Sequence, residues 1–171
     1  MKLFVDNRNV MVENADQTNI LGGSFRNFRG EKRQFNDAGK RNFNLVVSPE
    51  QAEELANIGC NVKYLKPRDD DEEEATPFVK VNVAFGKYPP ELYLVSKKSK
   101  KLLNEDGLGL LDGVVFKNAD LVLRTYHRDE HSCSLYLQRG FFEIKTDPIT
   151  AKYEDYMDTE DLEEDEAVPF N

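Results

Sequence analysis

Short segments in which apolar and polar residues alternate dominate the chain between residues 42 and 145. Residues 42–48, NFNLVVS, place Phe43, Leu45 and Val47 on one side. Residues 77–86, PFVKVNVAFG, repeat the pattern with four apolar side chains facing one way and Lys80 facing the other. Further runs of this kind lie at residues 61–66, 91–96, 119–127 and 134–145. Because a period of two is typical of half-buried strands, the chain is predicted to be mainly β.

Helical signals are few. Ser48 is a good N-cap, Pro49 suits the first helical position, and Gly59 is a stop signal, so one helix is predicted between them. A second short helix is expected over residues 99–103 or 107–113. Closely spaced strands with one or two brief helices indicate a small, partly closed β-barrel or a sandwich.

Charge divides the chain into two parts. The net charge is −9, yet residues 153–171 hold nine acidic side chains and no Lys or Arg. The first 152 residues therefore balance 23 acids against 23 bases, and six of these acids lie together at residues 69–74. We expect a folded domain over residues 1–150 with a basic face, and a disordered acidic tail over residues 151–171.

Targeting signals and cysteine usage favour the cytoplasm. No apolar run approaches the ~20 residues that cross a bilayer, and the start lacks a secretory signal. Cys60 and Cys133 have neither metal-ligand nor redox spacing, so buried free thiols in a reducing compartment are expected.

Aromatic rings and cations alternate in residues 25–44, FRNFRGEKRQFNDAGKRNFN, which carry a local charge of about +4. Single-stranded nucleic acid needs rings on which bases stack and cations that neutralise phosphates. Most Phe side chains in proteins are core residues, so the position of each ring in the strand alternation is used to separate core rings from exposed ones. Phe43 is assigned to the core, Phe25 stays ambiguous, and Phe28 and Phe35 are candidates for stacking. The candidate contacts in this segment are Arg26, Phe28, Arg29, Lys32, Arg33, Phe35, Lys40 and Arg41.

Further basic residues could extend this surface. Lys63 and Lys66 follow the predicted helix, and residues 97–101, KKSKK, are either part of the track or a solvated face. Arg124 and Tyr126 lie on the same side of their predicted strand and form another candidate pair.

The blocks RNFRG…FNDAGKRNFNLVV, NVKYLKPRDDDEEE, VKVNVAFGKYPPELYLVS and LLDGVVFKNADLVLRTY resemble bacteriophage single-stranded-DNA-binding proteins with an acidic C-terminal tail. The resemblance runs from about residue 25 to residue 144. It implies an OB-like barrel of five strands whose concave face and loops hold single-stranded DNA. It also implies a protein without enzymatic activity or a cofactor, acting in phage DNA replication, recombination or repair in the host cytoplasm, with a homodimer as an open alternative.

The resemblance also gives the tail a role. In such proteins an acidic stretch ending in Pro-Phe or Phe is gripped by polymerases, helicases or recombination proteins, and it can compete with DNA for the protein's own basic groove. One departure is Asn171, which follows the aromatic tip. The residues assigned to partner binding are Glu164, Asp165, Glu166, Val168, Pro169 and Phe170.

Other function classes have weaker support. HRDEH at residues 127–131 matches a zinc-peptidase pattern, but that motif needs a helix, and these residues are predicted to form a hairpin loop. The Gly107 and Gly109 doublet lacks the Lys-Ser/Thr of a P-loop. A protein-interaction or virion module, and binding of RNA in place of DNA, remain alternatives.

Overall fold

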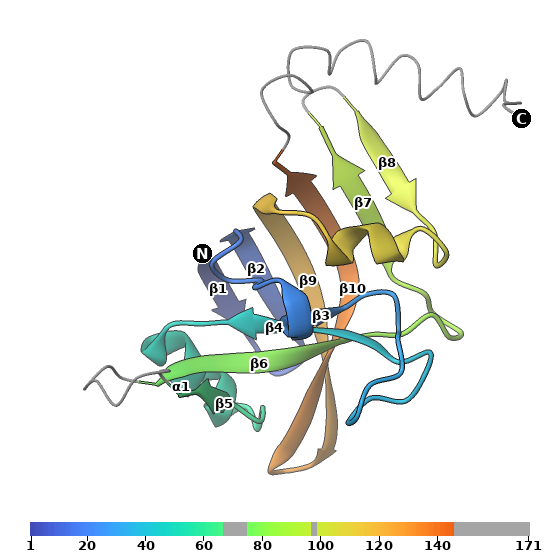
Figure 1. Cartoon of the computed structure of the whole chain (residues 1–171). Helices are drawn as coiled ribbons and strands as arrows, with labels where there is room; N and C mark the ends of the chain where they lie inside the picture. Colours follow the sequence, from blue (N-terminus) through green and yellow to red (C-terminus); the bar gives the residue numbers. More distant parts are fainter. Residues whose placement is uncertain (67–74, 97–98, 146–171) are drawn as a thin grey trace, which may run out of the picture.

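Ten strands among the described residues form one continuous sheet. The computed structural model of the chain describes residues 1–66, 75–96 and 99–145 (Figure 1). The strands are β1 (Lys2–Val5), β2 (Asn9–Ala15), β3 (Arg26–Asn27), β4 (Arg41–Val46), β5 (Lys63–Leu65), β6 (Thr76–Val83), β7 (Glu91–Val95), β8 (Lys100–Leu103), β9 (Phe116–Asp129) and β10 (Ser132–Ile144).

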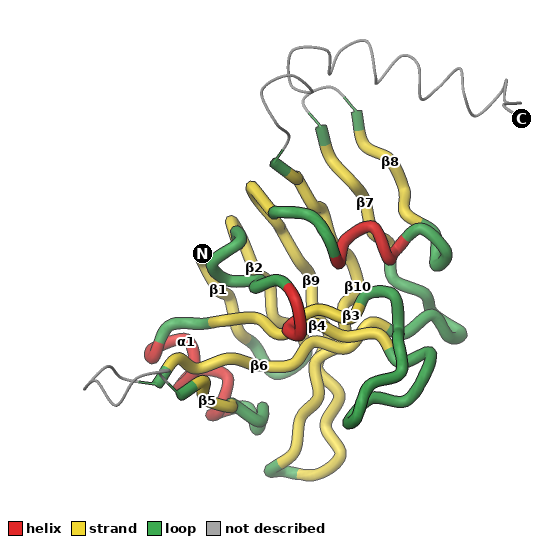
Figure 2. Tube along the Cα trace, in the orientation of Figure 1, coloured by secondary structure: helices red, strands yellow, loops and turns green. Residues whose placement is uncertain are grey.

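The sheet follows the order β1-β2-β9-β10-β6-β4-β3, with β5 beside β6 and the pair β7–β8 attached to β10. The mainly β, OB-like fold expected from the sequence is confirmed. The predicted number of five strands is wrong, and the sheet is not closed, because β1 and β3 end its hydrogen-bonded path without pairing to each other. Figures 1 and 2 show β4 and β6 crossing the long β9–β10 pair at a steep angle.

β10 changes its partner along one edge. It pairs in parallel with β6 only at Leu135 and Tyr136, and in parallel with β7 from Arg139 to Glu143. Its pairing with β9 shifts register between Leu137 and Arg139. β6 and β7 therefore separate at this point, and the loop that joins them leaves the sheet there.

The predicted helix is confirmed as α1 (Pro49–Asn57). Ser48 and Gln51 form a capping box, and Gly59 has a φ of 93°, which a residue with a side chain adopts only with strain. The expected second helix is a 3-10 turn, η2 (Leu108–Asp112), because residues 100–103 pair with β7 as β8. A shorter 3-10 turn, η1, covers Gly23–Phe25. No helix among the described residues has the length and apolar character needed to cross a membrane.

The core lies between the inner faces of the strands and these turns. Its largest fully buried apolar side chains are Phe28, Phe43, Phe116, Phe142, Ile20, Leu45, Leu55, Leu92, Leu108, Leu111 and Leu121. Phe43, Leu45 and Val47 are all buried, as the alternation in residues 42–48 predicts. The buried face leaves the polar face of β6 and β10 open on the other side of the sheet.

Candidate nucleic-acid interface

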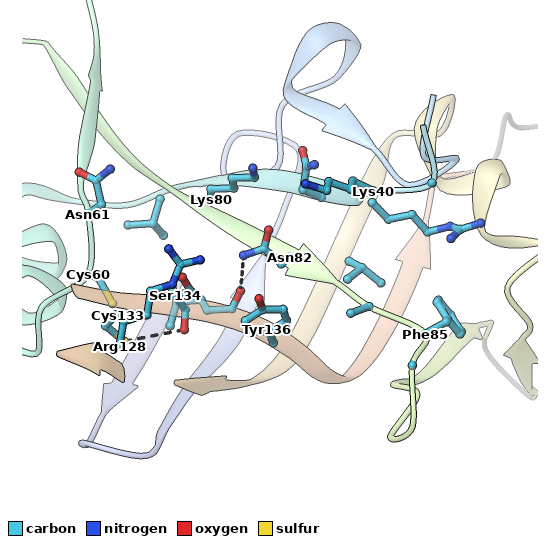
Figure 3. A pocket seen from close by; sticks show the side chains of 18 of the residues that line it. Lys40, Cys60, Asn61, Lys80, Asn82, Phe85, Arg128, Cys133, Ser134 and Tyr136 are labelled. Atoms are coloured by element: carbon cyan, nitrogen blue, oxygen red, sulfur yellow. Dashed lines mark hydrogen bonds between the residues drawn. The ribbon is translucent and has the colours of Figure 1, made fainter. Parts of the chain in front are cut away.

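A groove of about 610 Å³ lies over the junction of β4, β6 and β10. We call this depression the groove; its walls come from the start of β4, from β6 and the loop after it, from the α1–β5 connection and from the β9–β10 hairpin. Figure 3 shows Lys40 and Lys80 along one side, Ser134 and Tyr136 on the opposite side, and Asn82 between them. The groove is therefore an open channel across several strands.

Strand register explains why polar side chains line the groove. Asn42 lies opposite Asn82, Asn82 opposite Tyr136, and Tyr136 opposite Arg124, so one row crosses four strands. Directly opposite residues point to the same face of a sheet. The amide of Asn82 also donates to the Leu135 carbonyl at 3.2 Å, which fixes the side chain at the β6–β10 junction.

The groove carries a strong positive charge. Among the residues that the structure describes, its cations are Lys40, Arg41, Lys63, Lys80 and Arg128, and its one carboxylate is Glu105. Within the described residues, no carboxylate forms an ion pair with Lys63, Lys80 or Arg128. These cations are therefore positioned to meet phosphates.

Arg41 lines the groove and is held in place by two contacts. Its Nη1 donates to Glu105 at 3.0 Å, and its guanidinium lies 5.7 Å from the centre of the Phe85 ring. Its buried Nε has no hydrogen-bond acceptor among the described residues. Phe85 and Tyr136, both half-buried, add two rings to the groove, and a ring in such a position can stack on a base.

Arg26 was predicted to contact DNA, and the structure corrects this: the residue is 1% exposed. Its Nε donates to Leu21 O, Nη1 to the carbonyls of Leu111 and Val114, and Nη2 to Ile20 O and Gln17 Oε1. All five N–H donors of the guanidinium are thus satisfied inside the protein, and its Cζ lies 4.3 Å from the centre of the Phe116 ring. Burial lowers the pKa of Arg26, and Asp112 opposes this effect.

Phe28 was predicted to stack on a base, and this is also wrong, because the ring is fully buried. It stacks on Phe43 with ring centres 5.0 Å apart and meets Phe142 edge-on at 6.1 Å. The sequence argument placed Phe28 on an exposed face because it shares that face with Arg26. A charged neighbour does not imply exposure when the fold supplies every acceptor that the neighbour needs.

The remaining candidates in residues 25–44 fall into two groups. Lys40 and Arg41 line the groove. Arg29 forms an ion pair with Glu31 at 3.4 Å. Arg33 donates to the carbonyls of Ser24 and Arg26, so the Arg33 side chain holds the loop together. Lys32 is exposed, and Phe35, 92% exposed, lies in the turn closed between Arg33 and Asn36; neither lines the groove.

Of the candidates outside this segment, Lys63 lines the groove, whereas Lys66 is exposed beyond it. Arg124 and Tyr126 stand next to the groove, because they lie opposite Tyr136 and Ser134 on the neighbouring strand. The ring of Tyr126 meets that of Tyr136 edge-on at 6.5 Å. This pair was predicted from strand phase alone, and the structure places both residues on the same face as the groove.

Sequence reasoning missed Lys80, Asn82, Arg128 and Tyr136. Lys80 and Asn82 were recognised as the polar face of their strand, so the alternation in residues 77–86 contained the signal. Arg128 could not be found in this way, because it lies in HRDEH. Those residues form the β9–β10 hairpin and not a helix, as predicted, and His127 Nε2 lies 2.8 Å from the Asn7 carbonyl oxygen.

Cys60 and Cys133 lie side by side at the floor of the groove as free, buried thiols, as expected. Burial raises the pKa of the Cys60 thiol to about 12, and the neighbouring Cys133 adds to this effect. No group of three potential metal ligands occurs among the residues that the structure describes.

Several predicted residues lie outside the described ranges. These are residues 97 and 98 of the KKSKK run and the tail residues Glu164, Asp165, Glu166, Val168, Pro169 and Phe170.

A groove with five cations and two rings on a β-sheet face fits single-stranded nucleic acid, and the comparison with known families agrees. Residues 4–168 match the family described as "Putative phage ssDNA-binding domain". The chain belongs to this family. The match confirms the resemblance seen in the sequence and identifies a phage single-stranded-DNA-binding domain. No curated protein and no solved structure matches the chain.

Proposed function

We propose that the groove binds single-stranded DNA with little sequence preference, and that the protein coats and protects exposed strands during phage DNA replication, recombination or repair. The observation that carries this proposal is the combination, among the described residues, of five cations, one carboxylate and two rings along one polar sheet face. The amides of Asn42 and Asn82 add neutral hydrogen-bonding groups that suit any base. We propose a binding role for the groove and no catalytic one.

Stacking and phosphate contacts favour unpaired strands. A ring can stack on a base only where the base is exposed, whereas a duplex would need a helix or ribbon that enters a groove of the DNA. Each neutralised phosphate of a single strand contributes about −0.7 to the slope of log K against log salt, so five groove cations would give about −3.5.

Fluorescence anisotropy with labelled dT oligomers, across a salt series, tests the proposal. Lys80→Gln combined with Arg128→Gln should weaken binding and make the slope shallower by about 1.4, because two phosphate contacts are lost. The matched control is Lys2→Gln with Lys117→Gln, which removes the same charge from residues that do not line the groove. Equal losses in the two double variants would show that net charge, and not the groove, governs binding.

The choice of ligand is tested in the same assay. A duplex of matched length should bind much more weakly than dT, and a preference for rU would assign the groove to RNA. Negligible affinity for every oligonucleotide would favour a protein-interaction or virion module.

We propose further that residues 151–171 form an acidic tail that recruits a replication or recombination protein through Val168, Pro169 and Phe170. An aromatic tip can enter an apolar pocket while Glu164, Asp165 and Glu166 meet basic residues around it. The groove is the surface for which such a tail would compete with DNA. Deletion of residues 153–171 should tighten DNA binding at low salt and abolish partner recruitment, and unchanged affinity would reject the competition.

A further inference from the structure

A second depression continues the groove along β10. It has a volume of about 360 Å³ and shares Ala84 and Tyr136 with the groove, so the two are contiguous. Beyond Tyr136 its lining includes Tyr88, Arg124 and Arg139, together with the carboxylate of Glu91. It lies where β10 changes partner from β6 to β7, a place that the twisted sheet leaves uncovered.

The β6–β7 loop brings an aromatic ring to this depression. Tyr88 is 81% exposed although it lies in a loop whose other ring, Phe85, is half-buried. Lys87 Nζ lies 5.6 Å from the centre of the Tyr88 ring, so the exposed ring carries a cation beside it. An aromatic ring exposed in this way is accessible for stacking on an unpaired base.

Two arginines complete the lining. Arg124 forms no ion pair with any carboxylate among residues 1–66, 75–96 and 99–145. Arg139 lies 3.5 Å from Glu91, which holds it against the start of β7. The depression thus combines an exposed ring, an arginine without an ion pair among the described residues, and an arginine held by Glu91. This combination of a ring and cations resembles that of the groove.

We propose that this depression is a second subsite for single-stranded DNA, in which Tyr88 stacks on a base while Lys87 and Arg124 neutralise the adjoining phosphates. This inference rests on the proposed function of the groove. In this arrangement the bound DNA runs from the groove past Tyr136 into the subsite. The β6–β7 loop presents Phe85 to the DNA in the groove and Tyr88 to the DNA in the subsite. The subsite adds affinity only when the oligomer is long enough to reach it.

The test is a length series of dT oligomers, from about 3 to 16 nucleotides, measured by anisotropy with the full chain. Tyr88→Ala should weaken binding of the longest oligomers by roughly 5- to 100-fold and leave the shortest binding oligomers unchanged. Tyr88→Phe should behave as the original chain, because the ring is kept. Phe4→Ala, which removes a 54% exposed ring that lines neither depression, is the matched control and should have no effect at any length.

The possible failures are distinct. If Tyr88→Ala weakens all lengths equally, or none, the second subsite is wrong even when Lys80→Gln with Arg128→Gln still weakens binding through the groove. If the original chain binds no oligomer of any length, the proposed function itself fails. Thermal unfolding of Tyr88→Ala should match that of the original chain, since the ring is exposed, and a lower unfolding temperature would overturn the subsite in favour of a structural role.

Discussion

Arg26 and Arg128 show that a cation's sequence neighbours do not decide its role. Both stand among other charged or aromatic residues, but only Arg26 was a candidate for DNA contact from the sequence. Arg26 meets five acceptors inside the fold and is closed to solvent. Arg128 is exposed, lines the groove, and forms no ion pair within the described residues.

The difference shows that the hydrogen-bond acceptors around a cation decide whether it has a structural role or is available to bind a ligand. A buried guanidinium persists because each donor finds a carbonyl or an amide oxygen, whereas an unpaired buried cation would be costly. A cation that the fold leaves without such acceptors retains its capacity to bind a ligand. The same contrast holds for rings, since Phe28 is covered by Phe43 and Phe142 while Tyr136 faces the groove.

The rings give the largest expected effect. Phe28→Ala should lower the free energy of unfolding by about 3–5 kcal/mol, because it empties a fully buried site against two other rings. Tyr136→Ala should instead weaken binding of single-stranded DNA, by about 1–3 kcal/mol. Urea unfolding and anisotropy on both variants test whether Phe28→Ala loses stability and Tyr136→Ala loses DNA binding. A Phe28→Ala protein that is stable but binds DNA poorly would restore Phe28 to the interface.

The arginines should behave in the same way. Arg26→Met leaves several buried carbonyls without donors, so we expect a loss of at least about 3 kcal/mol in the free energy of unfolding. Arg128→Met should change that free energy by no more than about 0.5 kcal/mol, since the residue is exposed. It should make the salt dependence of DNA binding shallower by about 0.7 in log–log slope. Urea denaturation and salt titration of DNA binding on both variants test this. A stable Arg26→Met with weakened DNA binding, and an unstable Arg128→Met, would contradict the prediction.

The strands of this fold were predictable where burial imposes a period of two, as in residues 77–86 and 134–145. β1 and β2 were missed, although Val10 and Val12 are buried and Met11 between them is half-exposed. Their polar residues, such as Asn9 and Asn14, obscured the alternation. The partner change of β10 from β6 to β7, which creates the depression beside Tyr136, depends on contacts between distant strands, which no local pattern encodes.

The site was predictable only in part, for a related reason. Strand phase placed Arg124 and Tyr126 on one face, as the strand register shows, and the sequence singled out Lys40, Arg41 and Lys63, which line the groove. Composition failed at Arg26, because the acceptors for its guanidinium come from as far away as Leu111 and Val114.

Phe35 sharpens the comparison between buried and accessible rings, because it is the one exposed ring of residues 25–44, whose other rings are at least half-buried. Phe35→Ala should change the free energy of unfolding by no more than about 0.5 kcal/mol. If the bound DNA reaches the turn that contains Phe35, the variant should lose about 1–3 kcal/mol of binding free energy for single-stranded DNA. Anisotropy with long dT oligomers decides this, with Phe4→Ala as the exposed-ring control. Unchanged binding would confine the interface to the groove and to the depression beside it.

The smallest expected effect is on the pH dependence of stability and comes from Cys60. Its thiol lines the groove but is buried like a core residue. Its pKa is about 12 in the folded chain against an ordinary value of 9.0, so the folded state resists forming the thiolate. Below pH 9 the thiol is protonated in both states, and its contribution to stability is complete. As the pH rises from 9 towards 12, the unfolded chain ionises first and this contribution is progressively lost. Urea unfolding at pH 8 and pH 10 under reducing conditions should therefore show a smaller alkaline loss for Cys60→Ala than for the original chain, and equal losses would mean that the groove leaves this thiol open to water.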